Sequence, residues 1–520
     1  MPIVNPYWLI TTLASIPAIA GSPTSPRVTL DPIGSFRSGG VGAAEIGAYH
    51  PATRRVYFTN AERNAIGILD VSDPASPVAI RWIDLAPYGG GVNSVAVSER
   101  LIAAAVEGVV KQDPGRVVVF DLEGALVSLV EVGALPDMLT FTPDGRRIVV
   151  ANEGEPSEDY SVDPEGSVSV IDLPEDPRRL GQRHVRTADF RRFNTEPIDP
   201  TIRVFGPGAS AAQDLEPEYI AISDDGTTAW VTLQENNAIA VIDLDTARVT
   251  ALLPLGHKDH SRHALDASNR DGGIRVRPAP VFGMYQPDTI RSITIDGTTY
   301  LLCADEGDPR GYRAFDERVR VKDLTLDPTV FPDAEELQKD EYLGRLRVTR
   351  TLGDTDGDGD FDALYAFGGR GFSIRDTDGR LVFDSGPQFE LITALQNPET
   401  FNTDDSPEAG FESRSPERGP EPEAIAAGRI GDRTYAFIGM ERTSSIVVYD
   451  ITEPSKSEPV GYASRRRSAG QFSPSDPGDA APESIVFVPA SDSPNGEPML
   501  ITCNEWSGTV SFWRVSVEPR

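Results

Sequence analysis

The sequence has 520 residues, with 48 Lys and Arg against 80 Asp and Glu, so its formal net charge is −32. Nucleic acids and anionic membrane surfaces attract basic patches, and this balance argues against both as partners. A hydrophobic content of 39%, with 21 Phe and 14 Tyr, is too high for a disordered chain. The acidity therefore belongs to a folded protein, and it suits one that binds cations or works outside the cell.

The N-terminus has the pattern of a secretory signal peptide. Residues 7–20 are apolar or small, and Ala18-Ile19-Ala20 before Gly21 matches a small-x-small cleavage site, although no Lys or Arg precedes the apolar run. We expect residues 1–20 to be removed on export and residues 21–520 to form one secreted or periplasmic domain. A buried N-terminal segment is the alternative. No later stretch reaches the ~20 apolar residues of a membrane span, and we expect none.

A degenerate repeat of three short strands organises the rest of the chain. Each unit opens with an acidic or amide residue, its second strand ends at a glutamate, and its third usually closes on an aspartate. The openings are Glu45, Asn93, Asp137, Glu218, Asp288, Glu423 and Glu483. The second strands end at Glu62, Glu107, Glu153, Glu235, Glu306, Glu441 and Glu505. The third strands close on Asp70, Asp121, Asp172, Asp243, Asp376 and Asp450, with Arg514 in the seventh unit.

The repeat predicts an all-β fold, a seven-bladed β-propeller with long rim insertions. Segments such as 167–171 and 238–242 are short and rich in β-branched residues, and Asp-Gly turns separate the strands. Helical periodicity is nearly absent, apart from residues 334–340. Short strands repeating at blade length, without a helix in each unit, are typical of propellers.

The segments outside the repeat are expected to close the ring and to cover one rim. The last unit stops before a fourth strand, which residues 27–36 could supply, so that the ring closes without an exposed sheet edge. Insertions near 180–213, 254–283, 309–368 and 391–420 are expected on one rim, over the channel mouth. The two cysteines, Cys303 and Cys503, fall in predicted strands and are expected to be buried free thiols.

Three stretches resemble the choice-of-anchor I family, which includes the mesenchyme-specific cell-surface glycoprotein group. They are residues 135–173, 280–287 (PVFGMYQP) and 319–359, within a resemblance that covers about 28–515. The resemblance implies a secreted or surface-tethered propeller, associated in some members with biomineralisation and calcium, and some bacterial relatives carry an alkaline phosphatase label. Two features depart from the family: we expect no anchor at the C-terminus, and Gly371 stands where Ser is expected.

An aspartate-rich segment is the sharpest local motif. Carboxylates alternate at Asp354, Asp356, Asp358, Asp360 and Asp362, and intervening glycines permit a tight curve that converges several oxygens on one hard cation. Calcium is the natural match, because it accepts six to eight oxygen ligands. Tyr365 stands where an EF-hand has its bidentate Glu, so we predict a calcium loop of another type. A polar turn is the alternative.

The repeated glutamates form the second candidate site. Innermost propeller strands face the axis, so equivalent positions should converge and repel one another unless protons, arginines or metal neutralise them. With nearby amides and one aspartate, this ring could hold a second metal in the channel. Its predicted members are Glu62, Glu107, Asn152, Glu153, Glu235, Asp305, Glu306, Glu441, Asn504 and Glu505. Alternatively, these groups bind backbone amides or arginines and hold the blades together.

The insertion before Glu423 supplies the remaining candidates. Glu421 and Glu423 are expected at the rim, and Arg370 and Arg414 are the candidate catalytic residues, as clamps for an oxyanion or phosphate. Ordinary ion pairs are the alternative for both arginines. The chain has no G-x-S-x-G elbow, Walker loop, H-E-x-x-H or C-x-x-C motif.

Two functions follow from these observations. The first is a secreted calcium-binding propeller that acts as an extracellular binding or surface protein, with divalent cations and an extracellular polymer as partners. The second is a metal-dependent phosphomonoesterase, in which channel cations polarise the phosphoryl group of a phosphorylated small molecule and activate water.

Overall fold

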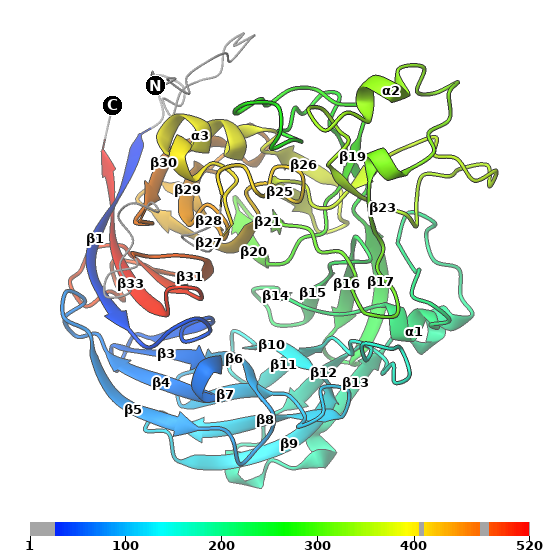
Figure 1. Cartoon of the computed structure of the whole chain (residues 1–520). Helices are drawn as coiled ribbons and strands as arrows, with labels where there is room; N and C mark the ends of the chain where they lie inside the picture. Colours follow the sequence, from blue (N-terminus) through cyan, green and yellow to red (C-terminus); the bar gives the residue numbers. More distant parts are fainter. Residues whose placement is uncertain (1–25, 405–409, 468–477, 519–520) are drawn as a thin grey trace.

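A computed structural model describes residues 26–404, 410–467 and 478–518, which form a ring of sheets around a central axis (Figure 1). The predicted signal peptide lies outside the described residues. Within these ranges, seven sheets have four antiparallel strands each, and an eighth has five. The all-β propeller prediction is confirmed, and the four-stranded sheets equal the sequence repeats in number.

The four-stranded sheets follow one another along the chain. The first four contain β2 (Gly47–His50), β3 (Arg55–Asn60), β4 (Ala65–Asp70) and β5 (Val78–Asp84); β6 (Val92–Val97), β7 (Leu101–Val106), β8 (Pro114–Asp121) and β9 (Leu126–Ala134); β10 (Pro136–Phe141), β11 (Arg147–Asn152), β12 (Ser167–Asp172) and β13 (Val185–Asp189); β14 (Ile220–Ile222), β15 (Thr228–Leu233), β16 (Ala238–Asp243) and β17 (Arg248–Pro254). The other three contain β20 (Ile290–Ile295), β21 (Thr298–Asp305), β25 (Gly371–Asp376) and β26 (Leu381–Asp384); β27 (Pro422–Ile430), β28 (Arg433–Met440), β29 (Ser445–Asp450) and β30 (Glu458–Ser464); β31 (Pro482–Val488), β32 (Met499–Asn504), β33 (Thr509–Glu518) and β1 (Arg27–Arg37).

The hydrophobic core lies between neighbouring sheets. The middle strands of a blade are apolar on both faces; every residue of β7, for example, is buried. One core cluster joins residues of β3 and β4 to residues of β6, β7 and β8, the next blade. The outermost strands meet solvent instead, and Val78 and Ile80 of β5 are exposed. This explains why second and third strands read as continuous apolar runs in the sequence.

The ring closes as the sequence predicted. β1 pairs antiparallel with β33, from Arg27 opposite Glu518 to Arg37 opposite Thr509, and becomes the outermost strand of the last blade (Figure 1). Val28 and Leu30 of β1 are buried in the cluster that contains Trp513. Burial of these side chains gives the closing pair apolar contacts as well as ladder hydrogen bonds.

The insertions contain structure that the sequence did not indicate. β18 (His257–Asp259), β19 (Phe282–Met284), β24 (Tyr365–Ala366), β23 (Arg347–Thr349) and β22 (Arg318–Arg320) form the five-stranded sheet, in that order. Helix α2 (Ala334–Leu337) falls in the predicted helical segment, whereas α1 (Ala211–Asp214) and α3 (Gln388–Gln396) were not predicted. The short strands of the extra sheet come from segments far apart in sequence, so no local periodicity reveals them.

The two cysteines do not form a disulfide. Cys303 and Cys503 are both buried and free, as predicted, and burial raises the pKa of each thiol to about 12. Within the described ranges, no helix has the length and apolar character needed to cross a bilayer.

Candidate functional site

The acids that open the blades occupy a distorted backbone. In four blades, a residue in the left-handed region precedes proline and then the acid: Leu135, Gln286, Glu421 and Ala481 have φ of 46°, 43°, 49° and 57°. In the sheets of β6, β10, β27 and β31 the ladder also shifts register at or next to the acid or amide. Such bulges redirect a side chain, and non-glycine left-handed residues persist only where surrounding structure holds them.

These acids line a cavity of about 290 Å³ on the channel axis. Its acidic lining residues are Glu45, Asp137, Glu153, Glu218, Asp288 and Glu483. Asn93, Ser94 and Thr289 add polar groups, and no Lys or Arg is among the described lining residues. Six carboxylates therefore face one small volume without a cationic side chain in its wall.

Burial and crowding raise the pKa values of these carboxyl groups. Burial raises the pKa of Glu45 to about 8, and repulsion from Glu505 and Asp137 adds to the effect. Burial likewise raises the pKa of Glu218 and Glu483 well above the usual range, with neighbouring carboxylates contributing. Groups with such pKa values take up protons or cations readily, because either one removes like-charge repulsion.

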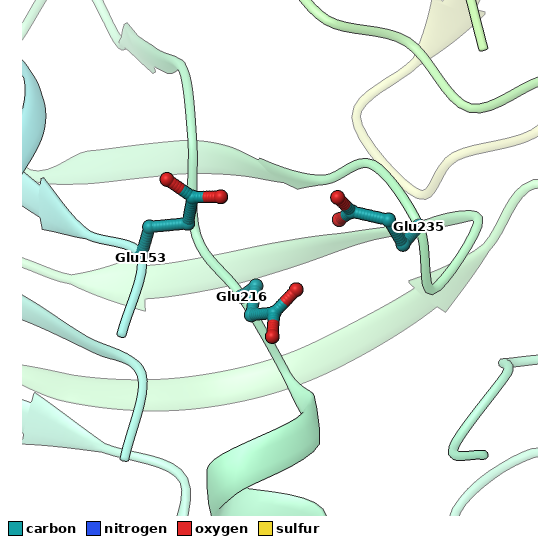
Figure 2. A group of neighbouring side chains, drawn as sticks. All are labelled: Glu153, Glu216 and Glu235. Atoms are coloured by element: carbon teal, nitrogen blue, oxygen red, sulfur yellow. The ribbon is translucent and has the colours of Figure 1, made fainter. Parts of the chain in front are cut away.

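Two groups of three acids bring carboxylate oxygens within 4.8 Å of one another on the axis. One consists of Glu153, Glu216 and Glu235, whose carboxylates converge from the end of β11, from the segment after α1 and from the turn after β15 (Figure 2). The other consists of Asp288, Glu306 and Glu423.

Three oxygens in and beside these groups have no hydrogen-bond partner in the described chain. Glu235 Oε2, Glu423 Oε2 and Glu218 Oε2 are each shielded from solvent and accept no hydrogen bond. Buried polar atoms are normally paired. Converging carboxylates with unpaired oxygens fit the ligand set of a hard divalent cation.

A third group, Glu306, Glu421 and Glu441, is neutralised by arginines. Arg418 lies 2.8 Å from Glu306 and 2.7 Å from Glu421, and Arg442 lies 3.0 Å from Glu421 and 3.1 Å from Glu441. Although burial opposes ionisation, Arg418, Arg414 and Arg442 lower the pKa of Glu421 to about 2. A cation would have to displace these guanidinium groups, so this part of the predicted ring is an ion-pair network.

Three members of the predicted ring point elsewhere. Asn152 donates to the hydroxyls of Ser167 and Ser169, Asn504 donates to Thr509, and Asp305 accepts from Ser373 at 3.1 Å. All three side chains lie inside their own blades. Successive residues of a strand face opposite sides. A glutamate that faces the axis is therefore preceded by a residue whose side chain points into the blade.

The remaining ring members are less enclosed. Glu62 is exposed and accepts a hydrogen bond from the Gly40 N–H at 3.1 Å. Glu107 is half-buried, and burial raises the pKa of its carboxyl group. Repulsion from Glu505 helps to raise the pKa of Glu45, which lines the acidic cavity.

The two candidate catalytic arginines have different surroundings. Arg370 is 3% exposed; it donates to Glu390 at 2.9 Å and to the carbonyls of Asp266 and Ser415, each at 2.7 Å. These contacts tie α3 to the insertions, and Arg370 does not line the channel cavities. Arg414 lines the channel mouth, where it donates to Glu421 at 2.5 Å. Of the two rim acids, Glu421 is neutralised by arginines, whereas Glu423 belongs to an axial acid group.

The aspartate-rich loop is exposed, and N–H groups of its own backbone donate hydrogen bonds to some of its carboxylates. Asp354, Asp356 and Asp362 form one converging group, and Asp360 and Asp362 form another with Asp327, which lies outside the aspartate-rich motif. Asp354 accepts from the N–H groups of Gly357 and Gly359 at 2.7 and 3.1 Å. Calcium binding by this loop stays a prediction.

The closed ring of sheets and the carboxylate-lined axial cavity define a β-propeller with an acidic centre. Residues 45–454 match the choice-of-anchor I domain, and the chain belongs to that family. The Mesenchyme-specific cell surface glycoprotein of Strongylocentrotus purpuratus is 29% identical over 324 residues, covering 56% of this chain and 40% of the relative. Gigasin-3a of Magallana gigas is 32% identical over 190 residues, covering 34% of this chain and 66% of the relative. The matches thus span less than two thirds of either relative.

Two solved structures show overall similarity at low sequence identity. Kuenenia stuttgartiensis hydrazine synthase aligns with 92% of this chain and 96% of its own, at 13% identity and a TM-score of 0.46. The β-propeller domain of Myceliophteria thermophila Cps50 (Swd1) aligns with 94% of this chain and all of its own, at 10% identity and a TM-score of 0.44.

Proposed function

We propose that the protein is an extracellular, surface-acting propeller that binds divalent cations on its axis, with calcium as the first candidate. The location is supported by the family and by the relative named as a cell surface glycoprotein. The cation is supported by one observation: six carboxylates line a cavity of about 290 Å³ that has no cationic side chain among its described lining residues.

Charge and ligand chemistry together favour calcium. Buried carboxylates that repel one another are stabilised by a bound cation, and calcium accepts six to eight oxygens in loose geometry. Glu153 and Glu235 would be ligands in one group, and Asp288 and Glu423 in the other. Glu216 has a weaker claim, because Arg310 lies 2.8 Å from its Oε2. The loop at 354–362 would take a second calcium ion, and an extracellular polymer or surface would bind at the rim.

Calcium binding at pH 7 is expected to release protons. Glu45, with a folded pKa of about 8, holds its proton between its unfolded pKa near 4.5 and pH 8, so the metal-free fold binds more protons than the unfolded chain in this window. Metal-free stability should therefore fall as pH rises from about 5 to 8, and calcium should reverse the fall. Titration calorimetry in buffers of different ionisation enthalpy measures the released protons. Binding without proton release at pH 7 would contradict the axial site.

A second candidate function is metal-dependent phosphomonoester hydrolysis. It is favoured by the position of Arg414 beside the axial carboxylates, because cations and a guanidinium group together stabilise a phosphoryl transition state. We expect p-nitrophenyl phosphate turnover to require an added divalent cation and to fall at least about a hundredfold in Glu153→Gln. Turnover that survives both chelation and the substitution would rule this function out.

A further inference from the structure

A second cavity, of about 450 Å³, lies at the channel mouth and has the opposite electrostatic character. Six arginines line it against four acids, in a protein whose net charge is −32. The arginines are Arg310, Arg318, Arg347, Arg414, Arg418 and Arg442, and the acids are Glu155, Glu235, Asp308 and Glu417. Glu235 also belongs to the group with Glu153, so the mouth adjoins the acidic cavity on the axis.

Most of these arginines are already saturated by acceptors. Arg310 contacts Asp214 and Glu216, and Arg418 contacts Glu306, Asp308 and Glu421. Such residues cannot bind a ligand without losing a buried pair.

Two arginines at the mouth keep unengaged donors. Arg347 faces Glu417 through Nε at 2.6 Å, and Arg414 donates to Glu421 through Nε at 2.5 Å. Within the described ranges, neither residue uses its two Nη nitrogens in a hydrogen bond. Their side chains are 31% and 19% exposed, so the donors are partly desolvated but reachable. Both residues line the mouth, and their four Nη groups have no hydrogen-bond acceptor of their own in the described chain.

We propose that the channel mouth binds a tetrahedral oxyanion, the phosphate or sulfate group of an ester, through the Nη groups of Arg347 and Arg414. Guanidinium forks match the oxygen spacing of such anions and bind them with two parallel hydrogen bonds each. A carboxylate has only two oxygens, whereas a tetrahedral oxyanion can engage both forks. Tyr312 and Phe367 also line the mouth and offer apolar surface to the organic part of an ester.

The test is calorimetric binding of phenyl phosphate, inorganic phosphate, sulfate and acetate to the full chain, with and without chelator. Wild-type protein is expected to bind the tetrahedral anions more tightly than acetate, and to do so after chelation. Tighter binding of phenyl phosphate would identify an ester as the ligand, and equal binding would identify the free anion. Binding that disappears on chelation would place the anion on a metal ion and overturn the arginine assignment. Binding that persists after chelation would support the arginine site even if the axial site binds no cation.

Variants separate the two arginines from general charge effects. Arg347→Gln alone is expected to weaken phosphate binding about tenfold, and adding Arg414→Gln to weaken it further. Arg146→Gln is the matched control, because its side chain is 84% exposed on another surface and should leave binding unchanged. Melting curves confirm that each variant is folded. Unchanged affinity in folded Arg347→Gln, or equal losses in the control, would overturn the proposal.

Discussion

Calcium is expected to raise the melting temperature of the wild-type protein, and substitution of Glu153 and Glu235 by Gln is expected to remove most of that rise. A ligand present at a hundred times its Kd stabilises the native state by about 2.7 kcal/mol. The variants lack charge but keep side-chain volume, so they lose the ligands without opening a cavity. The measurement is thermal unfolding with chelator and with calcium.

The same variants should respond in the opposite direction when calcium is absent. Each substitution removes a carboxylate that repels its neighbours, so the metal-free variants should melt at or above the wild-type temperature. Residues with a purely structural role would lose stability under both conditions. The matched control is Asp356→Ala with Asp358→Ala, which alters the exposed loop and leaves the axis intact. A full calcium response in the glutamate variants, lost in the loop variants, would move the dominant site to the loop.

Replacing Arg310 by Met is expected to destabilise the fold by about 3–5 kcal/mol, the usual cost of leaving a buried charge without its partner. Arg310 is 2% exposed and contacts both Asp214 and Glu216, which are equally buried. Asp214 also accepts the N–H groups of Phe205 and Gly206, each at 2.7 Å, so it cannot turn toward solvent without breaking the loop. Urea unfolding measures the loss.

Arg313 provides the control for this experiment. It lies three residues further along the same loop, but its side chain is 74% exposed and its guanidinium group lies 3.6 Å from Asp159, which is itself exposed. Arg313→Met should change the free energy of unfolding by less than about 0.5 kcal/mol. A loss below about 1 kcal/mol in Arg310→Met would show that water or rearrangement satisfies Asp214 and Glu216.

The repeat made the propeller predictable because each blade ends its strands on the same residue types. Even the pairing of β1 with β33 followed from a missing fourth strand. The acids that face the axis were only partly predictable. Asn152 and Glu153 are adjacent where β11 ends, and the sequence does not state which of the two side chains faces the axis.

The rest of the site depends on contacts between distant segments. Glu216 lies outside the repeat, next to α1, yet it completes the group with Glu153 and Glu235. Arg418 belongs to an insertion, and only its folded position neutralises Glu306 and Glu421. Neutralisation by arginines decides whether a ring of carboxylates attracts a cation. The spacing of residues along the chain does not show which carboxylates are neutralised in this way.

The closing pair of strands also dictates when this molecule can finish folding during its synthesis. The partner of Arg27–Arg37 is Thr509–Glu518, so the strand that precedes all the blades cannot pair until the last blade has been synthesised. Until then both flanking blades carry unpaired edges that can join other chains. The nascent protein therefore needs protection until residues 509–518 have been made, and truncation before residue 509 leaves an open, association-prone arc.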